Sequence, residues 1–248
     1  MIGGVHGDEP IGVKAIEAIL PTLKLLRGTV IFIIANPPAL AARQRFIDIN
    51  LNRALVNPPN LSTSEGRLAA QLMLVLDSCD ALLDLHAGMG TVPPFVICEP
   101  DALPIAARLP VDIVSTGWTT VEPGSTDAYL YNQGKSALCI ECGNRDDWQA
   151  NLPLAESTIK TFLAYYSLID YPPPPKRRQQ IVAVTYAVRK QSTNFRFVRP
   201  FASFERLQPG ELIAREGSIT YRAPNYDSYI IFPWAEAPVG AEVFLVGK

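Results

Sequence analysis

The sequence predicts an α/β protein with a mixed, largely parallel central sheet flanked by helices, followed by a small C-terminal all-β domain. Three observations carry this prediction. Short apolar runs, typical of buried strands, alternate with helical apolar patterns as far as residue 171. A run of four prolines then interrupts the pattern at 172–175, and the segments after it are short and strand-like. We therefore expect one domain over 1–171 and a β-rich domain over 172–248.

The expected elements of the first domain follow from local patterns. A buried strand ends near Val5, and the helical spacing from Pro10 to Leu20 begins with a proline suited to a first helical turn, with Asp8 as a candidate cap. Further strands are expected at 29–35, 81–85, 95–98, 111–115 and 137–140, and further helices at 64–76 and 154–168. Strands that alternate with helices favour a parallel sheet covered on both faces.

The second domain is expected to be all-β. The proline run is a stiff extended connector. Strand-like segments follow at 180–188, 195–198, 211–214 and 229–232, and Pro209-Gly210, Pro233 and Pro238 mark turns between and after them.

Composition narrows the class of protein. The 248 residues are 48% hydrophobic, which is typical of a folded chain, and 22 basic against 24 acidic residues give a formal charge of −2. We therefore expect neither nucleic acid nor a membrane as a partner. There is no secretory signal and no apolar run near the roughly 20 residues that span a bilayer, so we expect a cytoplasmic protein. The four cysteines fit reduced core residues.

The chain has only two histidines, and both follow predicted strands. His6 lies in Gly3-Gly4-Val5-His6-Gly7-Asp8-Glu9, and His86 in Asp84-Leu85-His86-Ala87-Gly88. Ligands bind at the carboxyl ends of strands in open α/β sheets. Two histidines and a glutamate form a zinc site that leaves a coordination position open. The alternative is two unrelated loop histidines with ordinary hydrogen bonds, but the shared position at strand ends favours the metal site.

Two further groups of residues strengthen this hypothesis. Glu141 ends the strand 137–140, where its carboxylate could act as a general base or, alternatively, pair with an arginine. The loop after strand 29–35 carries Arg43, Arg45 and Arg53. Guanidinium groups bind carboxylates and polarise carbonyls. Such a loop is often a solvated basic surface, but its interspersed apolar residues at 46–51 indicate that it is held against the core.

These motifs resemble, in sequence order, those of the succinylglutamate desuccinylase/aspartoacylase family of zinc carboxypeptidase-like hydrolases. They are Gly-x-His-Gly-x-Glu at 4–9, Asn-Pro-x-Ala…Arg…Ile-Asp…Leu-Asn-Arg at 36–53, Asp-Leu-His at 84–86 and Ile-Glu-x-Gly at 140–143. The resemblance extends to the end of the chain, where Ile230-Ile231-Phe232-Pro233 and Val239-Gly240 look like the family's closing strands.

The resemblance implies a role for each matching residue. His6, Glu9 and His86 would bind one Zn²⁺ per chain. Asp84 would either orient one of these metal ligands or have a structural role only. Glu141 would be the general acid/base, and Arg45 would polarise the scissile carbonyl. Asn52 and Arg53 would bind the substrate α-carboxylate. Further candidates for substrate contacts, without a motif to support them, are Arg43, Lys135 and Tyr229.

The implied activity is hydrolysis of the amide bond of a small N-acyl amino acid, and family members often form homo-oligomers. Alternatives are a metallocarboxypeptidase acting on peptide C-termini and a non-catalytic zinc- or ligand-binding protein. The chain departs from the family in two places. Only Met1 to Val5 precede His6, so the first strand is nearly absent, and its loss would leave backbone groups unpaired there unless another edge compensates. No arginine between His86 and Glu141 aligns with the one that binds an acidic side chain in aspartoacylase-type enzymes, so aspartate-like selectivity is not expected.

Overall fold

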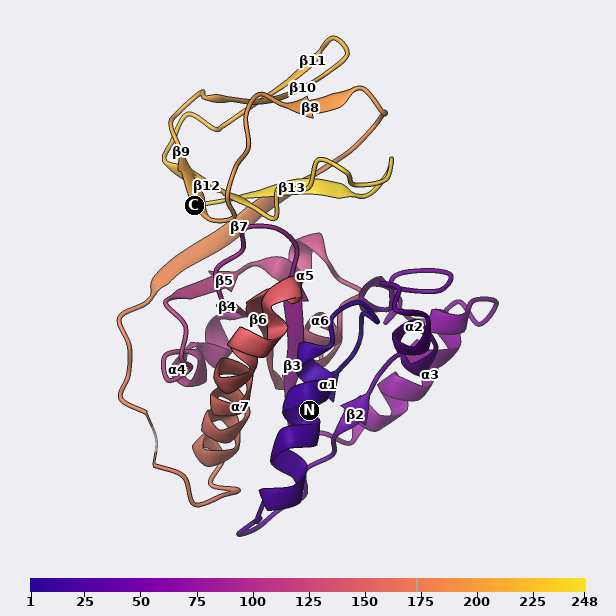
Figure 1. Cartoon of the computed structure of the whole chain (residues 1–248), viewed down its shortest axis with the longest axis vertical. Coiled ribbons are helices and arrows are strands. Elements are labelled where there is room, and N and C mark those ends of the chain that lie inside the picture. Colours follow the sequence, from indigo (N-terminus) through magenta and orange to yellow (C-terminus); the bar gives the residue numbers. More distant parts are fainter. Residues whose placement is uncertain (173) are drawn as a thin grey trace. The chain divides into compact units, whose positions relative to one another are not determined.

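The structure is a computed structural model that describes residues 1–172 and 174–248. Contacts divide these residues into two compact units (Figure 1). The first unit comprises 1–88 and 94–181, and the second comprises 89–93 and 182–248. The short segment 89–93, which follows the strand bearing His86, thus belongs to the second unit. Each unit is described by itself.

The first unit is built on a mixed, largely parallel sheet, as predicted, with strand order β2-β1-β3-β6-β4-β5. Strands β2, β1, β3 and β6 are mutually parallel, whereas β4 runs antiparallel to β6 and parallel to β5. The bounds are β1 Ile2–Gly3, β2 Ile33–Ile34, β3 Ala81–Gly88, β4 Phe95–Cys98, β5 Ile113–Thr116 and β6 Ser136–Asn144.

Helices cover both faces of this sheet, which can be followed in Figure 1. The α-helices are α1 Ile11–Ile19, α2 Pro37–Ala42, α3 Ser64–Asp77, α4 Leu103–Ala106, α5 Trp118–Val121, α6 Thr126–Tyr131 and α7 Trp148–Tyr165. Short 3-10 turns lie at Leu20–Thr22, Leu51–Arg53, Pro100–Ala102 and Arg145–Asp147. Helices α1 and α7 pack on the face that contains Leu83 and Leu85 of β3. Helices α3 and α6 pack on the opposite face with Leu82. Because side chains alternate along a strand, Asp84 and His86 lie on the α3/α6 face.

The second unit consists of antiparallel strands around its own apolar core. One ladder joins β7 Gln180–Arg189, β13 Glu242–Gly247, β12 Ser228–Ile231 and β9 Glu205–Leu207 in that order. A second joins β11 Ile219–Arg222, β10 Leu212–Glu216 and β8 Phe195–Phe197. The predicted all-β character of this part of the chain is confirmed.

One local expectation is wrong, and one question that the sequence left open is decided. Asp8 does not cap α1, because Pro10 occupies the cap position without a side-chain bond and Asp8 instead accepts a hydrogen bond from Arg145. The short strand β1 is not left unpaired. It bonds β2 on one side and β3 on the other, and the Met1 ammonium donates to the Ile31 carbonyl oxygen at 2.7 Å. Two residues are enough here because both neighbours are in register.

The remaining expectations concern the surroundings of the chain. Among the residues that the structure describes, no helix is both long and apolar enough to cross a bilayer. All four cysteines are free thiols, and burial raises the pKa of Cys98 to about 12. Cys139 and Cys142 are buried on β6, as expected of core residues rather than a redox pair.

Candidate metal centre and active site

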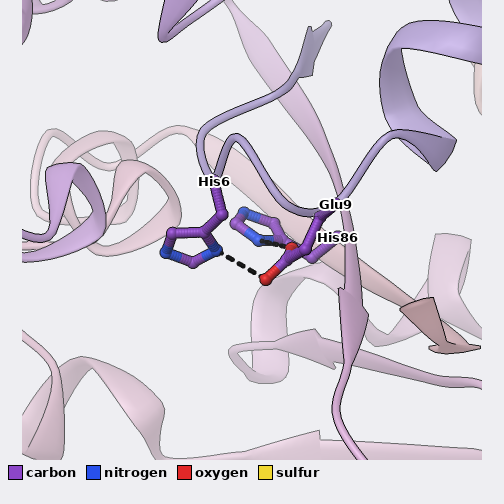
Figure 2. A group of neighbouring side chains, drawn as sticks. All are labelled: His6, Glu9 and His86. Carbon is purple, nitrogen blue, oxygen red and sulfur yellow. Dashed lines mark hydrogen bonds and ion pairs between the residues drawn. The ribbon is translucent and has the colours of Figure 1, made fainter. Parts of the chain in front are cut away.

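The three predicted metal ligands lie together at the carboxyl edge of the sheet (Figure 2). His6 and Glu9 come from the loop between β1 and α1, and His86 comes from β3. His6 Nδ1 lies 2.8 Å from Glu9 Oε1, and His86 Nδ1 lies 3.0 Å from Glu9 Oε2. The ring centroids of the histidines are 5.0 Å apart, and each side chain is at most 3% exposed. The arrangement offers one nitrogen from each ring and a carboxylate to a common point.

Glycines allow the ligand loop to turn sharply between strand and helix. Gly4 has φ +69°, a backbone conformation that residues with a side chain rarely adopt. A Cβ on Gly7 would lie 2.1 Å from the Ala39 carbonyl carbon, so no other residue fits where this loop passes the end of α2. The backbone conformation on either side of His6 therefore requires the two glycines of the Gly-x-His-Gly pattern.

The outer nitrogen of each histidine faces a polar partner. His6 Nε2 and Asn50 Oδ1 are 2.9 Å apart, and His86 Nε2 lies 3.1 Å from Asp84 Oδ2. Asp84 is fully buried and also accepts a hydrogen bond from Thr126 Oγ1. Such partners hold a ring and leave its other nitrogen for a metal. Of the two readings of Asp84, the geometry favours orientation of His86.

Arg45 completes the group around Glu9, donating a 2.6 Å hydrogen bond from Nη1 to Oε1. Burial disfavours the charged carboxylate, but the charges of His6 and Arg45 hold the pKa of Glu9 well below its usual range. Burial also opposes charge on His86, but Asp84 and Glu9 raise its pKa well above the usual value. The pKa of His6 is lowered by burial and by Arg45. Glu9 is thus held as an anion ready to bind a cation.

Glu141 lies beside His86 because of strand register. In the β3/β6 ladder His86 is opposite Glu141, so both side chains emerge on the same face of neighbouring strands. Burial raises the pKa of Glu141 to about 8, with Glu9 and Glu122 acting in the same direction and His86 and Arg45 against it. A carboxyl group whose pKa lies near neutrality can both accept and return a proton.

The donor set fits zinc. The nitrogen and oxygen atoms of His6, Glu9 and His86 lie within 4.8 Å of one another. Within the described part of the chain, several buried polar atoms at this place make no well-oriented hydrogen bond, among them Glu141 Oε2 and His6 Nδ1, although His6 Nδ1 lies close to Glu9 Oε1. A buried polar atom normally has a hydrogen-bond partner. The missing partners are explained if a further group binds at this place. Two imidazoles and one carboxylate are the protein ligands of many catalytic zinc sites.

The arginine-bearing loop is held against the core, as expected, and Glu65 at the start of α3 holds it. The Glu65 carboxylate is fully buried and accepts hydrogen bonds from the amides of Ile47 (2.7 Å), Asp48 (3.0 Å) and Ile49 (3.2 Å). The Asn36 side chain donates a further bond at 3.2 Å. Sequence reasoning missed Glu65, since an acidic residue in the first turn of a helix is also what an exposed helix prefers.

Asn52 and Arg53 follow Asn50 in this loop. Asn52 Oδ1 accepts a hydrogen bond from the Thr126 amide at 3.2 Å, and the Asn52 amide donates to Asn50 Oδ1 at 2.9 Å. The Arg53 guanidinium donates from Nη2 to Glu122 Oε1. Glu122 was also missed, because its segment, Thr120-Val121-Glu122-Pro123-Gly124, reads as an ordinary turn.

Of the other three candidates, Arg43 and Lys135 make their contacts elsewhere in the first unit. Arg43 ends α2 with φ 53° and lines a neighbouring cavity of about 710 Å³ with Asp8 and Arg145. The Lys135 ammonium bonds the carbonyl oxygens of Leu76 and Asp77 at the end of α3. Tyr229 lies on β12 in the second unit, so its contact with a substrate stays a prediction.

Fold and site together define an α/β protein with a mixed, largely parallel sheet and a His₂Glu group at the carboxyl edge of that sheet. The catalytic-domain model of the succinylglutamate desuccinylase/aspartoacylase family matches residues 1–168, and the barrel-sandwich hybrid domain model of the same family matches 179–247. The chain belongs to this family of hydrolases.

Individual relatives agree. A succinylglutamate desuccinylase of Vibrio vulnificus (strain YJ016) is 25% identical over 274 residues, spanning 98% of this chain and 78% of the relative. The crystal structure of succinylglutamate desuccinylase from Vibrio cholerae superposes with a TM-score of 0.82 at 19% identity, covering 100% of this chain and 80% of the other. A product-bound structure of the ectoine utilization protein EutE (DoeB) from Ruegeria pomeroyi gives 0.76 at 20% identity, covering 100% and 84%. At this identity, the solved structures establish the fold alone.

Proposed function

We propose that this protein is a zinc-dependent hydrolase that cleaves the amide bond of a small N-acyl amino acid. The observation that carries the proposal is the position of Glu141, a buried carboxyl group opposite His86 in the β3/β6 register and so beside the His₂Glu group. A site that only binds a metal or ligand does not need a titratable carboxyl group at that place. Family membership supports the hydrolase class.

His6, Glu9 and His86 would hold the zinc ion. When bound in a site with an open position, zinc lowers the pKa of a water molecule to about 7 and offsets negative charge on a carbonyl oxygen. The ionised state of Glu9 favours this role, since its pKa is held well below the usual range against the effect of burial. Asn50 and Asp84 would keep both rings in place.

The remaining steps belong to the side chains. Glu141 in its ionised form accepts the proton of the attacking water and later returns that proton to the leaving amine. Arg45, fixed by its 2.6 Å bond to Glu9 Oε1, presents a guanidinium group beside the carbonyl oxygen on which charge develops. Asn52 and Arg53 bind the carboxylate of the amino-acid part and thereby hold the amide in place.

Turnover of zinc-loaded protein on a panel of N-acetyl, N-succinyl and N-formyl amino acids tests the proposal. We expect release of the free amino acid, and a loss of roughly 10²–10⁴-fold in kcat in Glu141→Gln because the general acid/base is removed. Glu17→Gln is a matched control, since that carboxylate is 58% exposed and pairs only with Lys14 on the outer face of α1.

Three results would count against the proposal. A folded, zinc-loaded protein that releases nothing from the whole panel would favour a binding role. Cleavage of peptide C-termini in preference to acyl amino acids would favour a carboxypeptidase. Full activity in Glu141→Gln would remove that residue from the mechanism.

A further inference from the structure

Arg53, which we propose binds the substrate carboxylate, already forms an ion pair with a carboxylate of the protein. Arg53 Nη2 donates to Glu122 Oε1, and the two side chains are 29% and 12% exposed. Glu122 follows α5, and its segment is locked to the arginine loop by a 3.1 Å bond from the Leu55 amide to the Gly124 carbonyl oxygen. A Cβ on Gly124 would lie 2.5 Å from the Arg53 carbonyl oxygen, so the two segments are in close contact. The pair is therefore a built feature of the fold.

This pair is connected to the metal ligands through short hydrogen-bonded steps. Asn50 contacts His6 and also accepts a bond from the Asn52 amide, and Asn52 is the neighbour of Arg53 in the chain. Asn52 in turn accepts the amide of Thr126, whose hydroxyl bonds Asp84 beside His86. Arg53 and Glu122 thus lie on segments that are hydrogen-bonded to the residues holding His6 and His86.

Charge around the site is balanced in pairs. Arg45 is bonded to Glu9, Arg53 to Glu122 and Arg145 to Asp8. The only two cationic residues in the sequence between His86 and Glu141 are Arg108 and Lys135, and both bond backbone carbonyl oxygens elsewhere, at Pro174 and at Leu76 and Asp77. A substrate with a second carboxylate would therefore add negative charge beside Glu122.

A ligand with one carboxylate and one ammonium group fits this arrangement better. If only a carboxylate binds Arg53, it competes with Glu122 for the guanidinium group and adds a second negative charge beside that largely buried carboxylate, which is unfavourable. A ligand ammonium group beside Glu122 offsets this added negative charge. The ligand carboxylate, Arg53, Glu122 and the ligand ammonium then alternate in sign. The pair can select against acidic amino acids by repulsion and for basic ones by attraction.

We infer that the Arg53–Glu122 pair selects mono-N-acylated diamino acids, with the carboxylate bound by Arg53 and the free ammonium group bound by Glu122. The inference rests on the proposed amide hydrolysis and names the leaving amino acid as a basic one. Acylation at the α-nitrogen or at the side-chain nitrogen leaves the same two charged groups, so the substrate chemistry is common to both positions.

Matched substrates test the inference without any mutation. For the α-position, Nα-acetyl-L-ornithine is compared with N-acetyl-L-norvaline, which lacks only the side-chain amine, and with N-acetyl-L-glutamate. For the side-chain position, Nδ-acetyl-L-ornithine is compared with 5-acetamidopentanoate, which lacks the α-amine. We expect the amine to raise kcat/KM by about tenfold or more in at least one of these pairs, the size of effect that a charge-assisted hydrogen bond gives.

The variant Glu122→Gln should reduce that ratio to near one and improve the relative turnover of N-acetyl-L-glutamate. Asp112→Asn is the matched control, because it removes a carboxylate of the same unit that is 85% exposed and paired with Arg177. It should leave the ratio unchanged. If the ratio of kcat/KM between the two members of a matched pair persists in Glu122→Gln, Glu122 is not the residue that binds the ammonium group.

Failure of the inference and failure of the proposed function give different results. Turnover of N-acetyl-L-glutamate or N-acetyl-L-norvaline equal to or above that of the amine-bearing substrates would overturn the inference and leave the hydrolase standing. If no amide is cleaved, calorimetric titration with the same two matched pairs as uncleaved ligands decides the inference separately. Binding of the amine-bearing member at least about tenfold tighter in one pair, lost in Glu122→Gln, supports it, and equal affinities in both pairs overturn it.

Discussion

Glu65 offers a sharp test of how the arginine loop is held. The change Glu65→Gln replaces one carboxylate oxygen by an NH₂ group. With Oε1 kept as the acceptor for Ile47 and Asn36, the NH₂ group faces the amides of Asp48 and Ile49, which lose the acceptor now 3.0 and 3.2 Å away. Each buried donor left without a partner costs about 1–3 kcal/mol, so we expect the free energy of unfolding to fall by roughly 2–6 kcal/mol for the two amides.

The same residue predicts a pH dependence. Burial disfavours the Glu65 carboxylate, but the loop amides and Asn36 outweigh it and lower the pKa of Glu65. A lowered pKa in the folded state means that this stabilisation is fully present above the unfolded value of about 4.3 and is lost as pH falls through the folded-state pKa. The difference between wild type and Glu65→Gln should therefore be constant near neutral pH and shrink in acid.

Urea unfolding of wild type, Glu65→Gln and the exposed control Glu17→Gln at several pH values measures both effects. Zinc-loaded Glu65→Gln should also lose kcat, because Arg45 and Arg53 flank the loosened segment. A stability change below about 0.5 kcal/mol, which is the range of ordinary surface substitutions, would refute this account of the loop.

Three further predictions concern the metal site. Zinc at 100 times its dissociation constant should stabilise the metal-free protein by about 2.7 kcal/mol in thermal unfolding, and His86→Ala should abolish the effect. Asp84→Asn should weaken zinc binding about 10–100-fold in competition with a chromophoric chelator, and unchanged affinity would show that Asp84 does not orient His86. In the metal-free protein, burial raises the pKa of Glu141 to about 8. The folded state then holds a proton that the unfolded state releases near pH 4.3, so stability should fall as pH rises from about 5 to 8, and Glu141→Gln should remove that slope.

The sequence located the parts of the site that depend on strand ends. Both histidines and Glu141 follow apolar runs, and in a largely parallel sheet such ends meet at one edge. The structure brings His6, Glu9 and His86 together there. The predicted mixed sheet and the all-β C-terminal unit are also present, because periodicity of apolar residues is a strong local signal. Strand β4 runs antiparallel to β6, which no local pattern reveals.

What the sequence did not reveal are partners chosen by tertiary contact. Glu65 and Glu122 look like ordinary surface acids in the chain, yet one holds the arginine loop and the other pairs with Arg53. Asp8 was expected to cap α1, but Arg145, from far along the chain, takes its carboxylate. Lys135 was a candidate for substrate contact and instead caps α3. Charged side chains are long enough to reach several partners, so their contacts cannot be assigned before the fold is known.

Under the proposed function, catalysis and selectivity depend on different parts of this chain. The proposed metal ligands and Glu141 are supplied by strand ends and a glycine-dependent turn, so they require the fold shared with the family. The Arg53–Glu122 pair depends instead on a loop and on the turn after α5. A change at Glu122 can therefore alter the charge of the substrate pocket without moving Glu9, His86 or the register that brings Glu141 to them. Substrate choice in such a site can change by single substitutions while the hydrolytic group stays the same.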